Sequence, residues 1–189
     1  MKSKNWICNK LGGEFPPSLS FLFDYFFFSK GCIVEFTFFW KGLLSQWSHS
    51  PFKDKFGVLY SNAEQYMMAQ KAKLFKDTES YEKILKAETP SEQKALGRLV
   101  KNFNDKIWLS YSTMIVYEGN ILKFKQNKIH YDVLMSTKNT ILVEASPFDP
   151  IWGIKLTEND PRSKDMRTWL GQNRLGFILT KVRDDLREV

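Results

Sequence analysis

Cysteine and histidine are both scarce in this 189-residue chain, which contains two of each. Cys8 and Cys32 lie in the first fifth of the sequence and are too few for a disulfide framework or a cysteine-rich zinc site. His49 and His130 are far apart along the chain, which argues against a histidine-based triad or zinc ligand set. We therefore expect no metal and no cofactor, and a reducing, cytoplasmic setting.

A membrane-spanning segment is also missing. The most apolar stretch, residues 20–29, contains Asp24 and is about half as long as the roughly 20 residues that a spanning helix needs. No small-residue cleavage site follows it, so a secretory signal peptide is disfavoured. We expect no membrane association. Residues 1–35 are interpreted as an N-terminal extension of unknown role, either packed on the domain or poorly ordered, ahead of a domain at residues 36–189.

Ten glycines and seven prolines are too few for a low-complexity chain, and 43% hydrophobic residues are enough to form a core. Lysine and arginine exceed the acidic residues, which gives a net charge of +7. This excess suits anionic ligands such as phosphates or nucleic acid, although scattered lysines more often form a solvated surface. Nothing in the composition indicates the oligomeric state.

Capping motifs predict most of the helices. Ser61 and Glu64 form a capping-box pattern before a helix that reaches residues 74–75, and Thr89 and Glu92 form another before a helix from Pro90 to about residue 100. Asp77 can cap a helix at residues 78–86, and a longer helix is predicted after Asn104 as far as Leu122, which Gly119 ends or kinks. Two more helices are predicted at residues 127–135 and in the terminal segment from Trp169, where apolar residues recur at helical spacing.

Strand signals are few. Residues 140–145 are rich in β-branched side chains, and residues 152–156 alternate between apolar and small or polar side chains, with a proline-rich turn between the two segments. No βαβ alternation, glycine-rich phosphate loop or internal repeat is present. The sequence therefore predicts a mainly α (α+β) domain with a small β element.

The helix expected after Asn62 is apolar around most of its circumference, which is typical of a buried helix. Glu64 and Lys71 share one face of it because residues seven apart differ by about 20° in azimuth. A carboxylate and an amine on one buried face suggest a site. Alternatively, Glu64 only completes the capping box and Lys71 extends to solvent.

Two further segments carry candidate residues. Asp149 precedes Trp152 and Gly153 in a proline-bounded loop, where the tryptophan face suits a base or sugar and the glycine permits close backbone approach. Alternatively, Asp149 forms an Asx turn and Trp152 belongs to the core. Asn173 lies between Gly171 and Gly176, whose presence is explained by close packing or by ligand approach. For Trp108, core packing is the favoured interpretation.

Five blocks, in this order, resemble the NADAR family of YbiA-like proteins. They are residues 39–42 (FWKG), 44–52 (LSQWSHSPF), 61–71 (SNAEQYMMAQK), 144–153 (EASPFDPIWG) and 169–176 (WLGQNRLG). The resemblance extends from about Phe36 to Arg187. It implies a compact, mainly α fold and an N-glycosidase activity, on phosphoribosylamino-pyrimidine intermediates of riboflavin biosynthesis or on ADP-ribosylated guanine.

The resemblance also implies roles for individual residues. The catalytic set it indicates is Glu64, Lys71 and Asp149, and the substrate-binding set is Trp108, Trp152, Gly153, Gln65, Tyr66 and Asn173. Gln65 stands where the family motif often has histidine. A carboxylate can stabilise the positive charge that develops at C1′ of the ribose, and the tryptophans can stack on the ring. Lys71 has two candidate roles, as a phosphate partner or as a Schiff-base amine.

The predicted partner is therefore a small nucleotide-like substrate, with ADP-ribosylated guanine in nucleic acid as a further candidate. A non-catalytic module that binds ADP-ribose or a nucleotide is the alternative function. The combination of two carboxylates with a lysine favours the enzyme, because a pure binder of an anionic ligand has little need for both acids.

Overall fold

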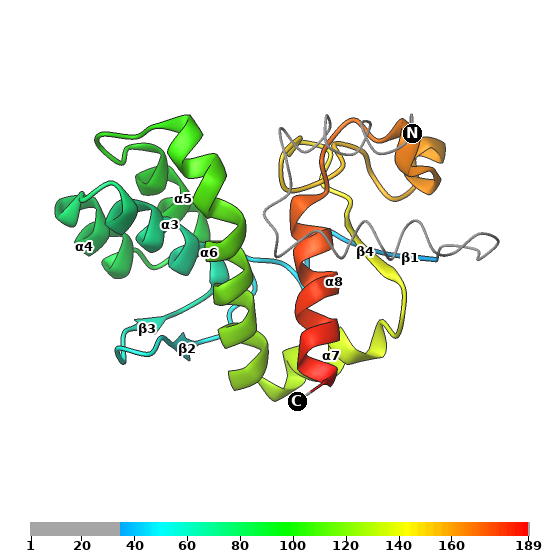
Figure 1. Cartoon of the computed structure of the whole chain (residues 1–189), viewed down its shortest axis with the longest axis horizontal. Helices are drawn as coiled ribbons and strands as arrows, with labels where there is room; N and C mark the ends of the chain where they lie inside the picture. Colours follow the sequence, from blue (N-terminus) through cyan, green and yellow to red (C-terminus); the bar gives the residue numbers. More distant parts are fainter. Residues whose placement is uncertain (1–34, 189) are drawn as a thin grey trace. The chain divides into compact units, whose positions relative to one another are not determined.

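The computed structural model describes residues 35–188, which fall into two units (Figure 1). One unit combines the described residues up to Phe39 with Asn139–Thr180. The other consists of Trp40–Lys138 together with the residues from Lys181 onwards. The two units therefore alternate along the sequence. The expectation of an extension at residues 1–35 falls almost entirely outside the described residues and stays a prediction.

The unit that contains Trp40–Lys138 is mainly helical. Its helices are α3 (Ala63–Leu74), α4 (Thr78–Lys86), α5 (Pro90–Arg98), α6 (Asp105–Gln126) and α7 (Lys128–Ser136), and a small antiparallel sheet joins β2 (Phe52–Lys53) to β3 (Leu59–Tyr60). Helix α3 contacts α4, α5 and α6, and α7 contacts α6. The predicted mainly α fold is confirmed. Among the helices of residues 35–188, none is apolar enough over a bilayer-spanning length to cross a membrane.

The predicted caps of α4 and α5 are present, and α6 has a side-chain cap as well. The Asp77 carboxylate accepts the Ser80 N–H at 3.0 Å at the start of α4, and Thr89 and Glu92 form the complete capping box of α5. The Asn104 side chain accepts the Ile107 N–H at 3.1 Å at the start of α6. These side chains satisfy backbone donors that the first turn of a helix leaves without a partner.

The predicted cap of α3 is wrong by one residue. Asn62, not Ser61, caps the helix, and its side chain accepts the Gln65 N–H at 2.9 Å. The side-chain Oε1 of Gln65 in turn accepts the Ser61 N–H at 2.7 Å. Glu64 is therefore the second helical residue and does not complete a capping box. Capping thus no longer accounts for an acid at this position.

The first two turns of α3 are buried on all sides, as predicted, because the residues from Ala63 to Ala69 are all buried, whereas Lys73 near its end is exposed. Tyr66 packs edge-on against Tyr60, with ring centroids 5.0 Å apart, and its ring also covers Gly119. Gly119 does not end the long helix, because α6 continues through it to Gln126. A Cβ at Gly119 would lie 2.6 Å from the Tyr66 ring, so glycine permits this close helix contact.

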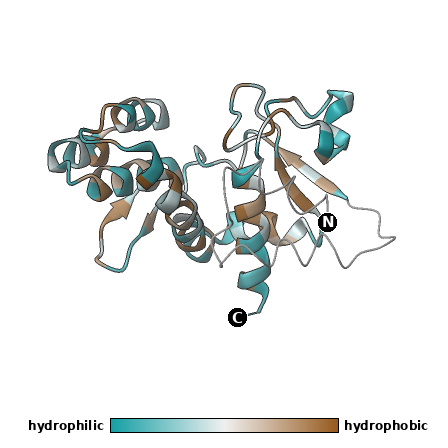
Figure 2. Ribbon diagram, turned by 45° about the horizontal axis from the view of Figure 1, so that its top comes forward, coloured by the Kyte–Doolittle hydropathy of each residue, from teal (hydrophilic) through white to brown (hydrophobic). Residues whose placement is uncertain are grey.

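The other unit is built on two parallel strands. Strand β1 (Phe36–Phe39) pairs with β4 (Ile141–Glu144), with Phe36 opposite Ile141 and Phe39 opposite Glu144. Both strands are hydrophobic (Figure 2), and they contribute to a cluster that includes Ile154 and Trp169. The predicted strand at residues 140–145 is confirmed as β4. Its partner β1 was not predicted.

The strand predicted at residues 152–156 is wrong. The carbonyls of Ile151, Trp152 and Gly153 accept the N–H groups of Arg174, Leu175 and Asn173 instead of pairing with a strand. These bonds satisfy the first turn of α8 (Arg174–Arg187), which follows the 3-10 turns η2 (Pro161–Lys164) and η3 (Met166–Thr168). The terminal helix is confirmed from Arg174 onwards, and its predicted apolar positions are buried: Leu175, Ile178, Leu179, Val182 and Leu186.

Close packing accounts for Gly171. A Cβ there would lie 2.3 Å from the Gly153 carbonyl oxygen, a backbone atom that cannot move away as a side chain can. We expect Gly171→Ala to destabilise the protein by about 1–3 kcal/mol. Thermal unfolding measures the effect as a fall in Tm of several degrees.

Gly97→Ala is the matched control for Gly171→Ala. Its Cβ would meet the flexible Met68 side chain, and alanine improves helix propensity by about 1 kcal/mol. A Gly171→Ala variant that melts at or above the temperature of Gly97→Ala would contradict the close backbone contact.

Candidate functional site

The predicted site residues lie in both units. The helical unit holds Glu64, Gln65, Tyr66 and Lys71 on α3 and Trp108 on α6. Glu64 is 3% exposed, and its backbone N–H donates to the Gln46 carbonyl at 3.1 Å. Lys71 lies two turns further along the same face, a rise of about 10 Å. A buried carboxylate and an amine therefore face the same side of one rigid helix.

The Lys71 amine has an aromatic environment. Its Nζ donates to the Gly97 carbonyl at 2.8 Å and lies 4.1 Å from the Phe103 ring centroid and 5.6 Å from that of Trp108. Burial lowers the pKa of Lys71, and the nearby Asp105 carboxylate partly offsets this shift. Trp108 is half-buried and not part of the core, contrary to the favoured interpretation. Lys71 and Trp108, which were predicted from separate parts of the sequence, therefore lie close together.

Gln65 and Tyr66 make contacts within the fold. The Gln65 amide nitrogen donates to the Ile84 carbonyl at 3.0 Å, which joins the start of α3 to α4. Tyr66 is 5% exposed, and burial followed by the charge of Glu118 raises its pKa. It lies about 200° around α3 from Glu64. These contacts explain both residues structurally, and their substrate-binding roles stay predictions.

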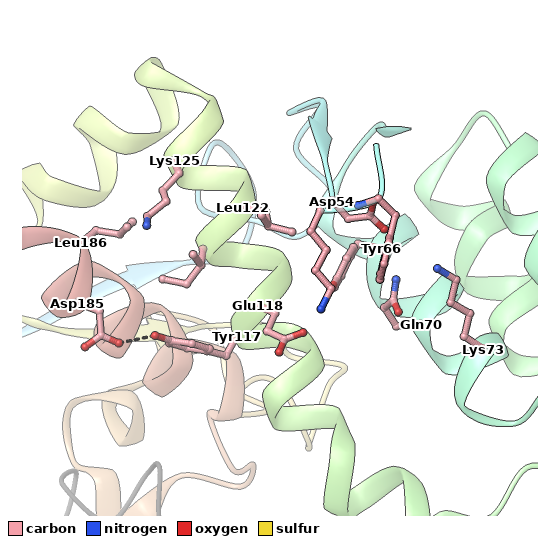
Figure 3. A pocket seen from close by; sticks show the side chains of 13 residues that line it. Asp54, Tyr66, Gln70, Lys73, Tyr117, Glu118, Leu122, Lys125, Asp185 and Leu186 are labelled. Carbon is pink, nitrogen blue, oxygen red and sulfur yellow. Dashed lines mark hydrogen bonds between the residues drawn. The ribbon is translucent and has the colours of Figure 1, made fainter. Parts of the chain in front are cut away.

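A pocket of about 570 Å³ opens on the Tyr66 side of α3 (Figure 3). Its carboxylates are engaged by side chains of the same unit, and Glu118 interacts with Tyr66. Asp185 accepts the Tyr117 hydroxyl at 2.6 Å, and Asp54 accepts the Tyr60 hydroxyl at 3.1 Å and two backbone N–H groups. Because this pocket faces away from Glu64 and Lys71, it is separate from the predicted catalytic face.

In the other unit, Asp149 organises the loop before α8. Its Oδ1 accepts the N–H groups of Ile151 and Trp152 at 2.9 and 2.8 Å, so the Asx turn considered from the sequence is present. Trp152 is half-buried, and the Arg174 guanidinium lies 4.9 Å from its ring centroid. Burial lowers the pKa of Arg174 to about 10. Asp149 thus orients a partly accessible aromatic ring.

Gly153 and Asn173 complete this loop. A Cβ at Gly153 would lie 2.8 Å from the Glu144 carbonyl oxygen, so the glycine accommodates the chain's own backbone. Asn173 is fully buried, and its amide accepts the Glu144 N–H at 2.9 Å and donates to the Leu142 carbonyl at 3.0 Å. Both residues therefore attach the loop and α8 to β4, and direct substrate contact stays a prediction.

Two residues of these clusters were not identified from the sequence. Phe103 lies against Lys71, and Arg174 lies against Trp152. Arg174 directly follows Asn173, so only its position in the motif could have indicated it. Among residues 35–188, no group of three or more histidine, cysteine, aspartate or glutamate side chains is arranged to hold a metal ion.

Comparison with known proteins identifies relatives over most of the chain. An N-glycosidase of Acanthamoeba polyphaga mimivirus is 43% identical over 147 residues, which cover 76% of this chain and 86% of that protein. A riboflavin biosynthesis protein of Vibrio vulnificus is 30% identical over 132 residues, 70% of this chain but 32% of that protein.

A structural comparison and a family model agree with the sequence relatives. The NMR structure of the E. coli protein YbiA superposes with a TM-score of 0.67 and 24% identity, covering 85% of this chain and 90% of YbiA. The NADAR domain model matches residues 38–187, a range that includes all the candidate residues described above. This chain therefore belongs to the NADAR domain family.

Proposed function

We propose that this protein is a hydrolase of N-glycosyl bonds that separates a phosphoribosyl or ADP-ribosyl group from the amino group of a base. The observation that supports this proposal most directly is the family match, which extends through both groups of candidate residues. The mimivirus relative carries the name N-glycosidase, and the Vibrio relative carries the name of a riboflavin biosynthesis protein. These names favour phosphoribosylamino-pyrimidines as the first substrates to test.

Lys71 is proposed to act as the nucleophile. Burial lowers the pKa of the Lys71 amine, which favours the uncharged form that can attack the C1′ carbon of a ring-opened sugar. The bond between C1′ and the amino nitrogen of the base then breaks, and that nitrogen takes up a proton. Water hydrolyses the resulting imine, which returns the free amine and the sugar aldehyde.

The two carboxylates have complementary proposed roles. Glu64, on the same face of α3 as Lys71, exchanges protons with the sugar and the leaving nitrogen. Asp149, in the other unit, holds the loop that presents Trp152, and its proposed role is that of the second carboxylate implied by the family resemblance. The Arg174 guanidinium lies against the Trp152 ring, and the tryptophan is proposed to stack on the base of the substrate.

The experiment is a chromatographic assay for the released base. We expect turnover on a phosphoribosylamino-pyrimidine, and ADP-ribosylated guanine is assayed in parallel as the second candidate. Release of base from neither compound, combined with saturable binding of ADP-ribose, would contradict the hydrolase and identify a binding module. A Glu64→Gln, Lys71→Arg double variant serves as the inactive control for contaminating hydrolases.

A further inference from the structure

Lys123, on α6, is a fully buried lysine that the proposed reaction does not use. Its side chain is 0% exposed, and its Nζ donates to the Ser45 carbonyl at 2.8 Å. Within residues 35–188 no carboxylate forms an ion pair with it. A charged ammonium has three donors and a large desolvation cost, whereas an uncharged amine fits a site with one carbonyl acceptor.

The carbonyl that Lys123 holds belongs to a turn that touches the start of α3. The next residue, Gln46, is also buried, and its side-chain oxygen accepts the Asn120 amide at 2.9 Å. The Gln46 backbone carbonyl accepts the Glu64 N–H, one of the first-turn donors of α3. A chain of direct contacts therefore links Lys123, through two adjacent peptide groups, to the backbone of Glu64.

We propose that Lys123, in its uncharged form, is a positioning residue for Glu64, which it acts on through the Ser45–Gln46 turn. The inference rests on the proposed function only where activity is the readout. Protonation of the buried amine brings a charge into this site, and the turn must move toward water to solvate it. That movement loosens the bond between the Gln46 carbonyl and the Glu64 N–H.

The other titratable groups around Lys123 are few. His130 on α7 has its pKa lowered by burial and then by the charges of Lys123 and His49, and its Nε2 lies 2.9 Å from the Ser48 hydroxyl. On β2, Lys53 is exposed, and α3 contributes Glu64 itself. Burial lowers the pKa of Lys123 to about 7. A transition near neutral pH can therefore come from Lys123 or, at lower pH, from His130.

The test follows the Glu64 amide by hydrogen exchange between pH 6 and 8, corrected for the intrinsic exchange rate. In the unmodified protein we expect protection to fall as the pH decreases through about 7, by roughly tenfold at one pH unit below the transition. Lys123→Met keeps the length of the side chain and removes the charge, so protection should no longer depend on pH. Lys125→Met, which alters an exposed lysine two residues away, should behave like the unmodified protein.

Two additional measurements keep the test decisive. His130→Gln should retain the transition, and an NMR titration of the Lys123 side chain in the unmodified protein should show proton uptake at the same pH. A transition lost in His130→Gln, or a Lys123 amine that stays charged up to pH 9, would overturn the inference. This holds even if Lys123→Met does not fold.

Turnover provides the second readout. The decrease of activity on the acid side in the unmodified protein should shift to lower pH in Lys123→Met and remain in Lys125→Met. If no N-glycoside is hydrolysed but the Glu64 amide shows the Lys123-dependent transition, the proposed function fails and the positioning of Glu64 stands. If turnover is present and the amide is insensitive to pH in both proteins, the positioning role is rejected.

Discussion

Replacing Glu64 with glutamine is expected to lower turnover by roughly 10²-fold or more while leaving Tm almost unchanged. The substitution keeps the shape of the side chain and removes its charge. As the second residue of α3, Glu64 also interacts favourably with the helix dipole, typically by about 0.3–1 kcal/mol, but a neutral glutamine costs less to bury than a carboxylate and this offsets the loss. The effect should therefore be catalytic, and steady-state kinetics with parallel thermal melting measures it.

Asn62, which caps α3, provides the control for Glu64→Gln. Asn62→Ala removes the side chain that accepts the Gln65 N–H and should destabilise the protein by about 1 kcal/mol, with a measurable fall in Tm. The two variants thus separate loss of catalysis from loss of helix stability at neighbouring positions. Normal turnover of folded Glu64→Gln at saturating substrate would reject this acid as part of the site.

Lys71→Arg should reduce turnover by at least roughly 10²-fold, because a guanidinium stays protonated and cannot form an imine. Borohydride added during turnover should trap the sugar on the unmodified protein, as a mass increase at Lys71 that the variant lacks. Lys73→Arg is the matched control, since this exposed lysine lies about 200° around α3 and faces the Tyr81 ring.

The alternative role of Lys71 predicts a different pattern. If its charge only balances a phosphate group, arginine should preserve turnover within about threefold and no adduct should form. Retention of activity in Lys71→Arg without trapping would therefore contradict the covalent mechanism and leave the hydrolase assignment intact.

Local capping chemistry made most of the helical unit predictable. Asp77, Thr89 and Asn104 each start a helix where the sequence indicated, because a cap and its donor are only three residues apart. The α3 start was misplaced because the segment Ser61–Asn62–Ala63–Glu64–Gln65 contains two overlapping capping patterns. Only the tertiary contact of Gln65 with α4 distinguishes them.

The strands were harder to predict because their partners are distant or unusual. Residues 36–39 do not alternate in polarity, and their partner β4 begins about a hundred residues later. Residues 152–156 do alternate, but their first carbonyls bond to α8, and Lys155 has a φ of 55° that ends any extended conformation.

The resemblance to a family identified the residues of the candidate site, but it did not identify the residues that hold them in position. Lys123 looks like any surface lysine near the end of a long helix, and its burial depends on the 44–50 turn folding over it. Arg174 likewise gives no signal in the sequence until the loop brings Trp152 beside it. Residues that position others in this way do so through tertiary contacts, which local sequence patterns do not encode.

The parallel pairing of β1 with β4 has a consequence for biosynthesis. A ribosome that adds about 5–20 residues per second needs several seconds or more to reach β4 after β1 has emerged. During that interval the strand that pairs with β1 in the described part of the structure has not been made, and the hydrophobic strand β1 is open to intermolecular association. The helical unit is synthesised in the same interval. We therefore expect the yield of native protein to depend on translation speed and on chaperones that shield β1.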